Sequence, residues 1–135
     1  MQTFSVFTYG TLQFSEVMQA VTGLNLKPVA ATLTGYQRFK IKERTFPGLI
    51  EKENTVTDGM LYRDLDETAI EKLDQFEDVM YERCLVDVQV NNETEQAFVY
   101  VTQKDYEDCL LDQEWSLEEF KSKYLKLYLK RIASF

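Results

Sequence analysis

A strand near the start of the chain runs directly into a polar loop opened by glycine, and this segment constrains the fold most. Residues 4–9 are rich in the β-branched and aromatic side chains that strands prefer. Gly10 then removes a Cβ at the strand end, so the backbone amides of Thr11 and Leu12 can approach a ligand closely and face an anion. The alternative is an ordinary tight turn, in which glycine serves only the backbone angles. If these amides do face a ligand, the end of the strand forms one wall of a binding pocket.

A helix predicted over residues 65–78 carries a carboxylate on its apolar face. Asp66 is a suitable N-cap for this helix. Its apolar stripe comprises Ala69, Ile70, Leu73 and Phe76. At ~100° per residue, Glu77 falls between Ile70 and Leu73, inside the stripe. Because burying an unpaired carboxylate costs several kcal/mol, Glu77 is expected either to be paired or to line a cavity with a raised pKa. The alternative is that the helix ends before Glu77, whose side chain then extends into solvent.

The absence of histidine narrows the chemistry that the chain can perform. The chain lacks the commonest general base, the usual serine or cysteine triads and imidazole zinc ligands. Cys84 and Cys109 are its only thiols, and we expect core residues rather than a disulfide or a metal site. A carboxylate is therefore the expected proton-transfer group near neutral pH, and Glu77 is the candidate.

The order of these segments resembles that of a known superfamily. The matching residues are Tyr9-Gly10-Thr11-Leu12, Leu73-Asp74-Gln75-Phe76-Glu77, Tyr81-x-Arg83 and a strand ending Ala97-Phe98-Val99-Tyr100. This order is similar to that of the γ-glutamylcyclotransferase-like superfamily, in its γ-glutamylamine cyclotransferase and AIG2-like branch. The resemblance implies a compact β-barrel flanked by helices. It also implies that Glu77 is the general base and that the loop from Tyr9 to Leu12, with Gly10 and Thr11, binds the glutamyl moiety.

The reaction that this resemblance implies is release of 5-oxoproline from a γ-glutamyl compound. The α-amine of the substrate attacks its own side-chain carbonyl, closes a five-membered lactam and expels an amine or amino acid. The protein supplies a group that removes one proton and returns another, and a carboxylate of raised pKa suffices. We expect neither a metal nor an organic cofactor. The short acidic connection Asp78-Val79-Met80 departs from the γ-glutamylamine branch and leaves the leaving group open.

The remaining segments predict a single domain over residues 1–135 of class α+β. Ser15 is expected to cap a short helix that Gly23 ends, and Ser116 to open a C-terminal helix with a capping box. Strands are expected at residues 29–41 with a bulge at Gly35, at 49–51, at 60–63, and at 83–90 and 96–102 around Asn91-Asn92. Several strands and few helices predict a small, mixed, mostly antiparallel β-barrel with flanking helices.

Five further residues are possible pocket-lining positions. Pro47 and Gly48 follow Phe46 in a predicted turn that suits a cavity rim. Tyr81 and Arg83 flank the start of a strand, and Arg83 either contacts substrate or pairs with Glu82, Asp87 or another acid. Tyr100 faces the barrel interior or its outside, depending on the strand register.

The C-terminal helix has two interpretations. Its apolar stripe comprises Leu117, Phe120, Tyr124, Leu127 or Tyr128, and Ile132. This stripe either packs against the barrel or forms a dimer surface, so a monomer or a weak homodimer is expected. Trp115, directly before the helix, either covers the pocket mouth or anchors the helix.

Charge and composition exclude several classes of partner. The net charge of −8 and the pI of about 4.6 oppose binding to nucleic acid or to an anionic membrane surface. No apolar run is long enough to span a bilayer, and no signal peptide is visible, which predicts a cytoplasmic protein. The expected partner is a small γ-glutamyl substrate. The alternatives are a noncatalytic small-molecule binder on the same barrel and an interaction protein that uses the C-terminal helix.

Overall fold

The computed structural model describes residues 2–132 of the chain. Its strands and helices are β1 (Phe4–Thr8), α1 (Ser15–Thr22), β2 (Val29–Lys40), β3 (Pro47–Leu65), α2 (Glu67–Glu77), β4 (Tyr81–Val90), β5 (Glu93–Thr102), α3 (Leu117–Lys123) and α4 (Leu125–Ile132). Three short 3₁₀ turns connect them: η1 (Thr11–Gln13), η2 (Asp78–Met80) and η3 (Lys104–Cys109). Within this part of the chain, no helix has the length and apolar character needed to cross a membrane.

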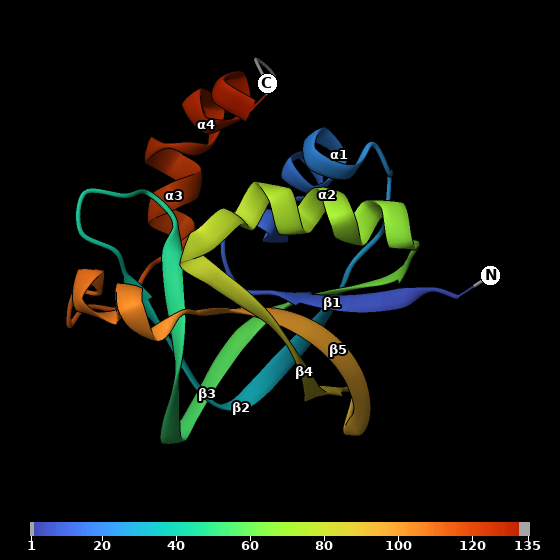
Figure 1. The fold of residues 1–135 in the computed structure, drawn as a ribbon, viewed down its shortest axis with the longest axis horizontal. Coiled ribbons are helices and arrows are strands. Elements are labelled where there is room, and N and C mark those ends of the chain that lie inside the picture. The colour runs from blue at the N-terminus through green and yellow to red at the C-terminus, as the bar shows by residue number, and fades with distance from the viewer. Residues whose placement is uncertain (1, 133–135) are drawn as a thin grey trace.

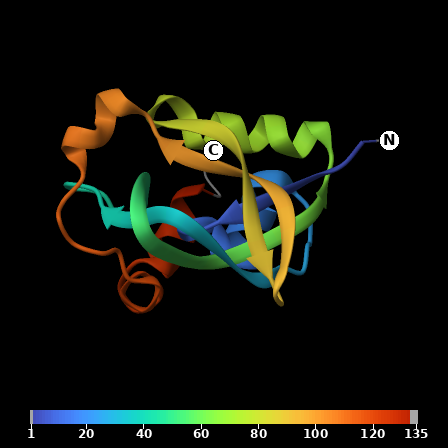
Figure 2. The same cartoon turned by 90° about the horizontal axis from the view of Figure 1, so that it is seen from below.

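The five strands form one sheet in the order β1-β3-β2-β4-β5. Neighbouring strands run antiparallel except β1 and β5, which are parallel and pair Val6 with Phe98, so the sheet closes on itself. The helices α1, α2 and α4 lie above the strands in Figure 1, and Figure 2 shows the molecule from below, turned by 90°. The expected α+β fold, with a mostly antiparallel sheet and flanking helices, is confirmed.

Side chains alternate along each strand, and at β1 both faces of the sheet are buried. On β1, Phe7 joins an inner cluster made of strand side chains and of Tyr9, which directly follows β1, whereas Val6 joins a helix-side cluster that includes Val17 of α1 and Leu73 of α2. The inner cluster comprises Phe7, Tyr9, Ala31, Leu33, Leu49, Leu61, Val88, Val90, Ala97 and Val99. Val6 and Phe7, adjacent on β1, are therefore both buried, one on each face of the sheet.

The prediction of two separate strands at residues 49–51 and 60–63 is wrong. Both segments belong to β3, a single strand of 19 residues that pairs along β2. The register between the two strands shifts between Thr34 and Tyr36, where Gly35 has a φ of 89°, so the expected irregularity at Gly35 is confirmed. Pro47 and Gly48, expected in a turn, are the first residues of β3.

The helix ends agree with most of the expected caps. Asp66 accepts a hydrogen bond from the amide of Ala69, Ser116 accepts one from the amide of Glu119, and Gly23 ends α1 with a φ of 79°. Ser15 is the first residue of α1 and does not cap it. The residue before it, Phe14, accepts hydrogen bonds from the amides of Val17 and Met18 at its carbonyl.

The C-terminal helix is divided rather than continuous. It consists of α3 and α4, which are separated at Tyr124, whose φ and ψ are −126° and −22°. The β4–β5 hairpin turns where expected, at Asn91 and Asn92, which have φ values of 51° and 68°. Cys84 and Cys109 are both free and half-buried.

Candidate functional site

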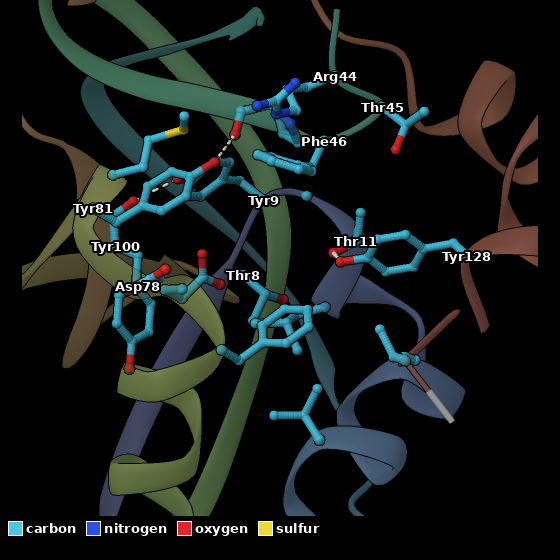
Figure 3. Close-up of a pocket in the computed structure, with 18 of the residues that line it drawn as sticks. Thr8, Tyr9, Thr11, Arg44, Thr45, Phe46, Asp78, Tyr81, Tyr100 and Tyr128 are labelled. Carbon is cyan, nitrogen blue, oxygen red and sulfur yellow. Dashed lines mark hydrogen bonds between the residues drawn. The ribbon is translucent and has the colours of Figure 1, made fainter. Parts of the chain in front are cut away.

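A cavity of about 1100 Å³ opens at the end of β1, beneath the helices. Its walls come from β1 and η1, the loop before β3, the C-terminal end of α2 with η2, the facing residues of β4 and β5, and α4 (Figure 3). Segments far apart in the sequence therefore meet at this cavity.

Most of the residues predicted from the sequence lie together at this cavity. The lining includes Tyr9, Gly10, Thr11, Leu12, Pro47, Glu77, Tyr81 and Tyr100. Gly48 and Arg83 do not line it. A Cβ on Gly48 would lie 2.5 Å from a Leu110 side-chain carbon, so this glycine serves close packing. The Arg83 Nε lies 3.3 Å from Asp74 Oδ1, and its guanidinium lies 4.5 Å from the Phe98 ring centre, which supports the ion-pair interpretation.

Glu77 is the last residue of α2 and projects into the cavity. The helix continues through this residue, so the alternative in which it ends earlier is wrong. Burial raises the pKa of the Glu77 carboxyl to about 8, because the surrounding protein disfavours the charged form. No cation within residues 2–132 forms an ion pair with Glu77. The carboxylate therefore lines a cavity without a charge partner, as one of the two sequence interpretations requires.

The backbone turns sharply directly after Glu77. The amide of Asp78 donates to the carbonyl of Asp74, and Asp78 has a φ of 61° and a ψ of −155°, a conformation that side chains other than glycine rarely adopt. Glu43, which also lines the cavity, has a φ of 60°. Strained backbone therefore borders the cavity on two sides.

Five tyrosines line the cavity, and four of them, all except Tyr106, form a hydroxyl hydrogen bond at its walls. Tyr9 donates to the carbonyl of Tyr100. Tyr81 donates to the carbonyl of Pro47 at 2.6 Å, and Tyr100 donates to Asp74 Oδ1 at 2.7 Å. The Tyr128 hydroxyl lies 3.2 Å from Thr11 Oγ1 (Figure 3). Burial raises the pKa of all four tyrosines, and the charge of Glu77 raises it further, so all four remain protonated at neutral pH.

Gly10 has a packing role that the sequence did not reveal. A Cβ on Gly10 would lie 2.8 Å from Cδ and 2.9 Å from Cγ of Pro47. The missing side chain thus lets the end of β1 pack against the first residue of β3. The Pro47 ring therefore leaves no room for a side chain at position 10, independently of any ligand that approaches the loop.

Two side chains outside the cavity hold its walls in place. Arg38 Nη1 donates to the carbonyl of Tyr9 at 2.8 Å, which positions the start of the loop. The Trp115 indole donates to the carbonyl of Thr45 at 2.7 Å, and its ring packs 5.7 Å from that of Phe120. Trp115 is buried and does not line the cavity, so it anchors the chain before α3 rather than covering the pocket.

The sequence interpretation missed the cations and the C-terminal side chains of the site. Arg44, Lys72 and Arg131 line the cavity beside three acids, Glu43, Glu77 and Asp78. With Glu77 protonated, this lining carries an excess of positive charge in a chain whose net charge is −8. Tyr128, Arg131 and Ile132 reach the cavity from α4. Nothing in the local sequence distinguishes Tyr128 from the other members of the apolar stripe.

Comparisons with known proteins identify the family of this chain. Residues 6–117 match the family described as gamma-glutamyl cyclotransferase, AIG2-like. AIG2-like protein C of Arabidopsis thaliana is 32% identical over 120 residues, which cover 87% of this chain and 69% of the plant protein.

Two solved structures have the same fold. A solution structure from Arabidopsis thaliana has a TM-score of 0.76 at 23% identity and covers 99% of this chain and 82% of its own. A protein named gamma-glutamyl cyclotransferase has a TM-score of 0.68 at 14% identity and covers 99% of this chain and 88% of its own. At these identities the two structures support the fold alone.

Proposed function

Because the chain belongs to the AIG2-like gamma-glutamyl cyclotransferase family, we propose that it converts a γ-glutamyl compound into 5-oxoproline and an amine or amino acid. The observation that carries this proposal is the position of Glu77. This carboxyl lies in a large cavity, without an ion-pair partner, and burial raises its pKa to about 8. Such a group can both accept and donate a proton near neutral pH.

In the proposed reaction, Glu77 acts as general base and then as general acid. The ionised carboxylate removes a proton from the substrate's α-ammonium, and the amine nitrogen attacks the γ-carbonyl carbon. Glu77 returns the proton to the leaving nitrogen as its bond to the γ-carbon breaks and the carbonyl re-forms. The ring nitrogen gives up its second proton to the departing amine, which leaves as an ammonium ion. No protein nucleophile and no cofactor is required. Holding the glutamyl chain folded back on itself supplies the remaining acceleration, because ring closure depends on orientation.

The rest of the cavity provides groups for binding the substrate. Thr11 and Leu12 begin η1, so their amides have no acceptor within that turn and can bind a substrate oxygen. Arg44, Lys72 and Arg131 supply positive charge for the substrate's carboxylate. Pro47, Tyr81 and Tyr100 complete the walls. The cavity of about 1100 Å³ leaves room for a leaving group beyond the glutamyl part.

Incubation of the protein with γ-glutamyl amines and γ-glutamyl dipeptides, followed by assay of 5-oxoproline, tests this function. Glu77→Gln keeps the size of the side chain but removes the ionisable group, so we expect turnover to fall by about 10²-fold or more. Glu71→Gln, an exposed position on the same helix, is the matched control and should leave turnover unchanged. A chelator or a thiol-blocking reagent should have no effect.

The possible outcomes separate the alternatives. Full activity in Glu77→Gln would contradict the general acid/base role. Binding of γ-glutamyl compounds without release of 5-oxoproline would identify a noncatalytic binding protein on the same fold.

A further inference from the structure

Of the five tyrosines that line the cavity, Tyr9, Tyr81, Tyr100 and Tyr128 have hydrogen-bonded hydroxyls, and the bonds of these four differ in one respect. Tyr9, Tyr81 and Tyr100 donate their hydroxyl protons to a carbonyl or a carboxylate, acceptors that cannot donate in return. Tyr128 instead pairs with the hydroxyl of Thr11, and either oxygen can be the donor. When Thr11 donates to Tyr128, the phenol proton is free for a ligand. Among these four residues, Tyr128 alone has this freedom.

The position of Tyr128 is fixed from two sides. Its ring meets the Phe120 ring edge-on, with centroids 5.3 Å apart and an interplanar angle of 79°. Its hydroxyl is held by Thr11, which is buried at the start of η1. The ring thus lies between the α3–α4 region and the loop that follows β1 (Figure 3). A hydroxyl held in this way is preorganised to donate into the cavity.

The proton remains on Tyr128 at neutral pH. Burial and the charge of Glu77 raise the pKa of this phenol and the hydrogen bond from Thr11 lowers it, with a result of about 12. Tyr128 is therefore a hydrogen-bond donor and not a base. It also lies beyond residues 6–117, the part of the chain that matches the family, so family membership assigns it no role.

We propose that Tyr128 is a catalytic residue, whose hydroxyl donates a hydrogen bond to the γ-carbonyl oxygen of the substrate. This role rests on the proposed cyclotransferase function and deepens it. As the α-amine nitrogen bonds to the γ-carbon, the carbonyl π electrons move onto the oxygen, and the hydrogen bond from Tyr128 strengthens as that charge develops. The phenol keeps its proton throughout. When the carbonyl re-forms and the leaving nitrogen departs, the hydrogen bond weakens again.

Tyr128→Phe tests the role, because it removes the hydroxyl and keeps the ring that packs on Phe120. We expect kcat for 5-oxoproline formation to fall by about 10²-fold, with KM within about twofold of wild type, since the interaction forms mainly in the transition state. The denaturant midpoint should hardly move. Tyr124→Phe, one turn earlier and outside the cavity lining, is the matched control and should leave kcat unchanged.

A second variant tests the pairing with Thr11. Thr11→Val keeps the shape of the buried side chain but removes its hydroxyl, so Tyr128 loses the bond that orients it. We expect a smaller loss of kcat than in Tyr128→Phe, and little further loss in the double variant, because both changes act through one donor.

Three results would overturn the proposal. An unchanged kcat in Tyr128→Phe, with active wild type, would remove this role and leave the cyclotransferase function intact. A loss matched by an equal shift in the denaturant midpoint would show that Tyr128 is structural. Wild type that releases no 5-oxoproline from any γ-glutamyl amine or dipeptide would overturn the proposed function itself, and the role of Tyr128 with it.

Discussion

The two faces of the closed sheet are packed in opposite ways. Val99 and Tyr100 are neighbours on β5, yet Val99 lies in the inner cluster of strand side chains and Tyr100 lines the cavity on the helix side. The inner cluster consists of aliphatic and aromatic side chains, of which only Phe7 and Tyr9 also line the cavity. The helix side combines apolar packing with tyrosine hydroxyls, Glu77 and a hollow of about 1100 Å³.

In this fold the inner cluster provides stability, and the helix side holds the groups that can perform chemistry. A filled apolar interior gains stability from every buried methylene group, so it tolerates no unpaired carboxylate. On the helix side, α2 and α4 do not close over the sheet completely, and the space between them accepts a carboxyl of raised pKa.

The largest effect is expected at Glu77, through the pH dependence of stability. Its pKa is about 8 in the folded chain against an ordinary value of 4.5, so between these pH values the native protein binds more protons than the unfolded chain. The free energy of unfolding of wild type therefore falls as pH rises through this window. In Glu77→Gln the effect is absent, and its advantage should grow by ~1.4 kcal/mol per pH unit and level off above about pH 8.

Denaturant titrations of wild type and Glu77→Gln at several pH values measure this difference. Glu71→Gln, titrated in parallel, controls for the loss of one negative charge at the surface. A difference between wild type and Glu77→Gln that does not change with pH would contradict the burial of this carboxyl.

The next effect is expected in the inner cluster, where Leu49 has no exposed surface. Leu49→Ala leaves a void among strand side chains that cannot close around it, so the free energy of unfolding should fall by about 2–5 kcal/mol. Because Leu49 does not line the cavity, kcat per folded molecule should change far less than in Glu77→Gln. Loss of kcat as large as in Glu77→Gln, under conditions where Leu49→Ala is folded, would show that the two faces are coupled.

A smaller effect is expected at Gly10, where the two faces meet. Gly10→Ala places a methyl group 2.8 Å from Pro47 Cδ, and such overpacking typically costs about 1–3 kcal/mol of stability. Pro47→Ala in the same chain removes the ring that the new methyl meets. We expect the double variant to lose less free energy of unfolding than the two single variants lose together, as measured by denaturant titration. Strict additivity would show that the methyl group does not meet Pro47.

Several parts of the fold could be predicted because their signals are local. Asp66 caps α2, Asn91 and Asn92 turn the β4–β5 hairpin, and Gly35 marks the irregularity in β2. Each depends on the conformational preferences of a few adjacent residues. The position of Glu77 in the apolar stripe was also visible, because helical periodicity sets the face of a side chain before any packing occurs.

Other features were wrongly predicted because packing between distant segments decides them. β3 reads as two short strands, since Glu51, Lys52 and Glu53 are exposed and polar, yet pairing with β2 extends it across both. The C-terminal stripe reads as one helix, yet it divides at Tyr124, where the ring packs 6.3 Å from that of Phe120.

The sequence by itself determined the α+β class, the carboxylate on the apolar face of α2 and the glycine at the end of β1. The tertiary structure alone decided which residues meet around that carboxylate. Tyr128 is separated from Thr11 by 117 positions, and Trp115 from Thr45 by 70. No local sequence pattern predicts either contact. The physical reason is that periodicity fixes which face of an element is apolar, whereas the partner of that face depends on how the closed sheet and the helices pack.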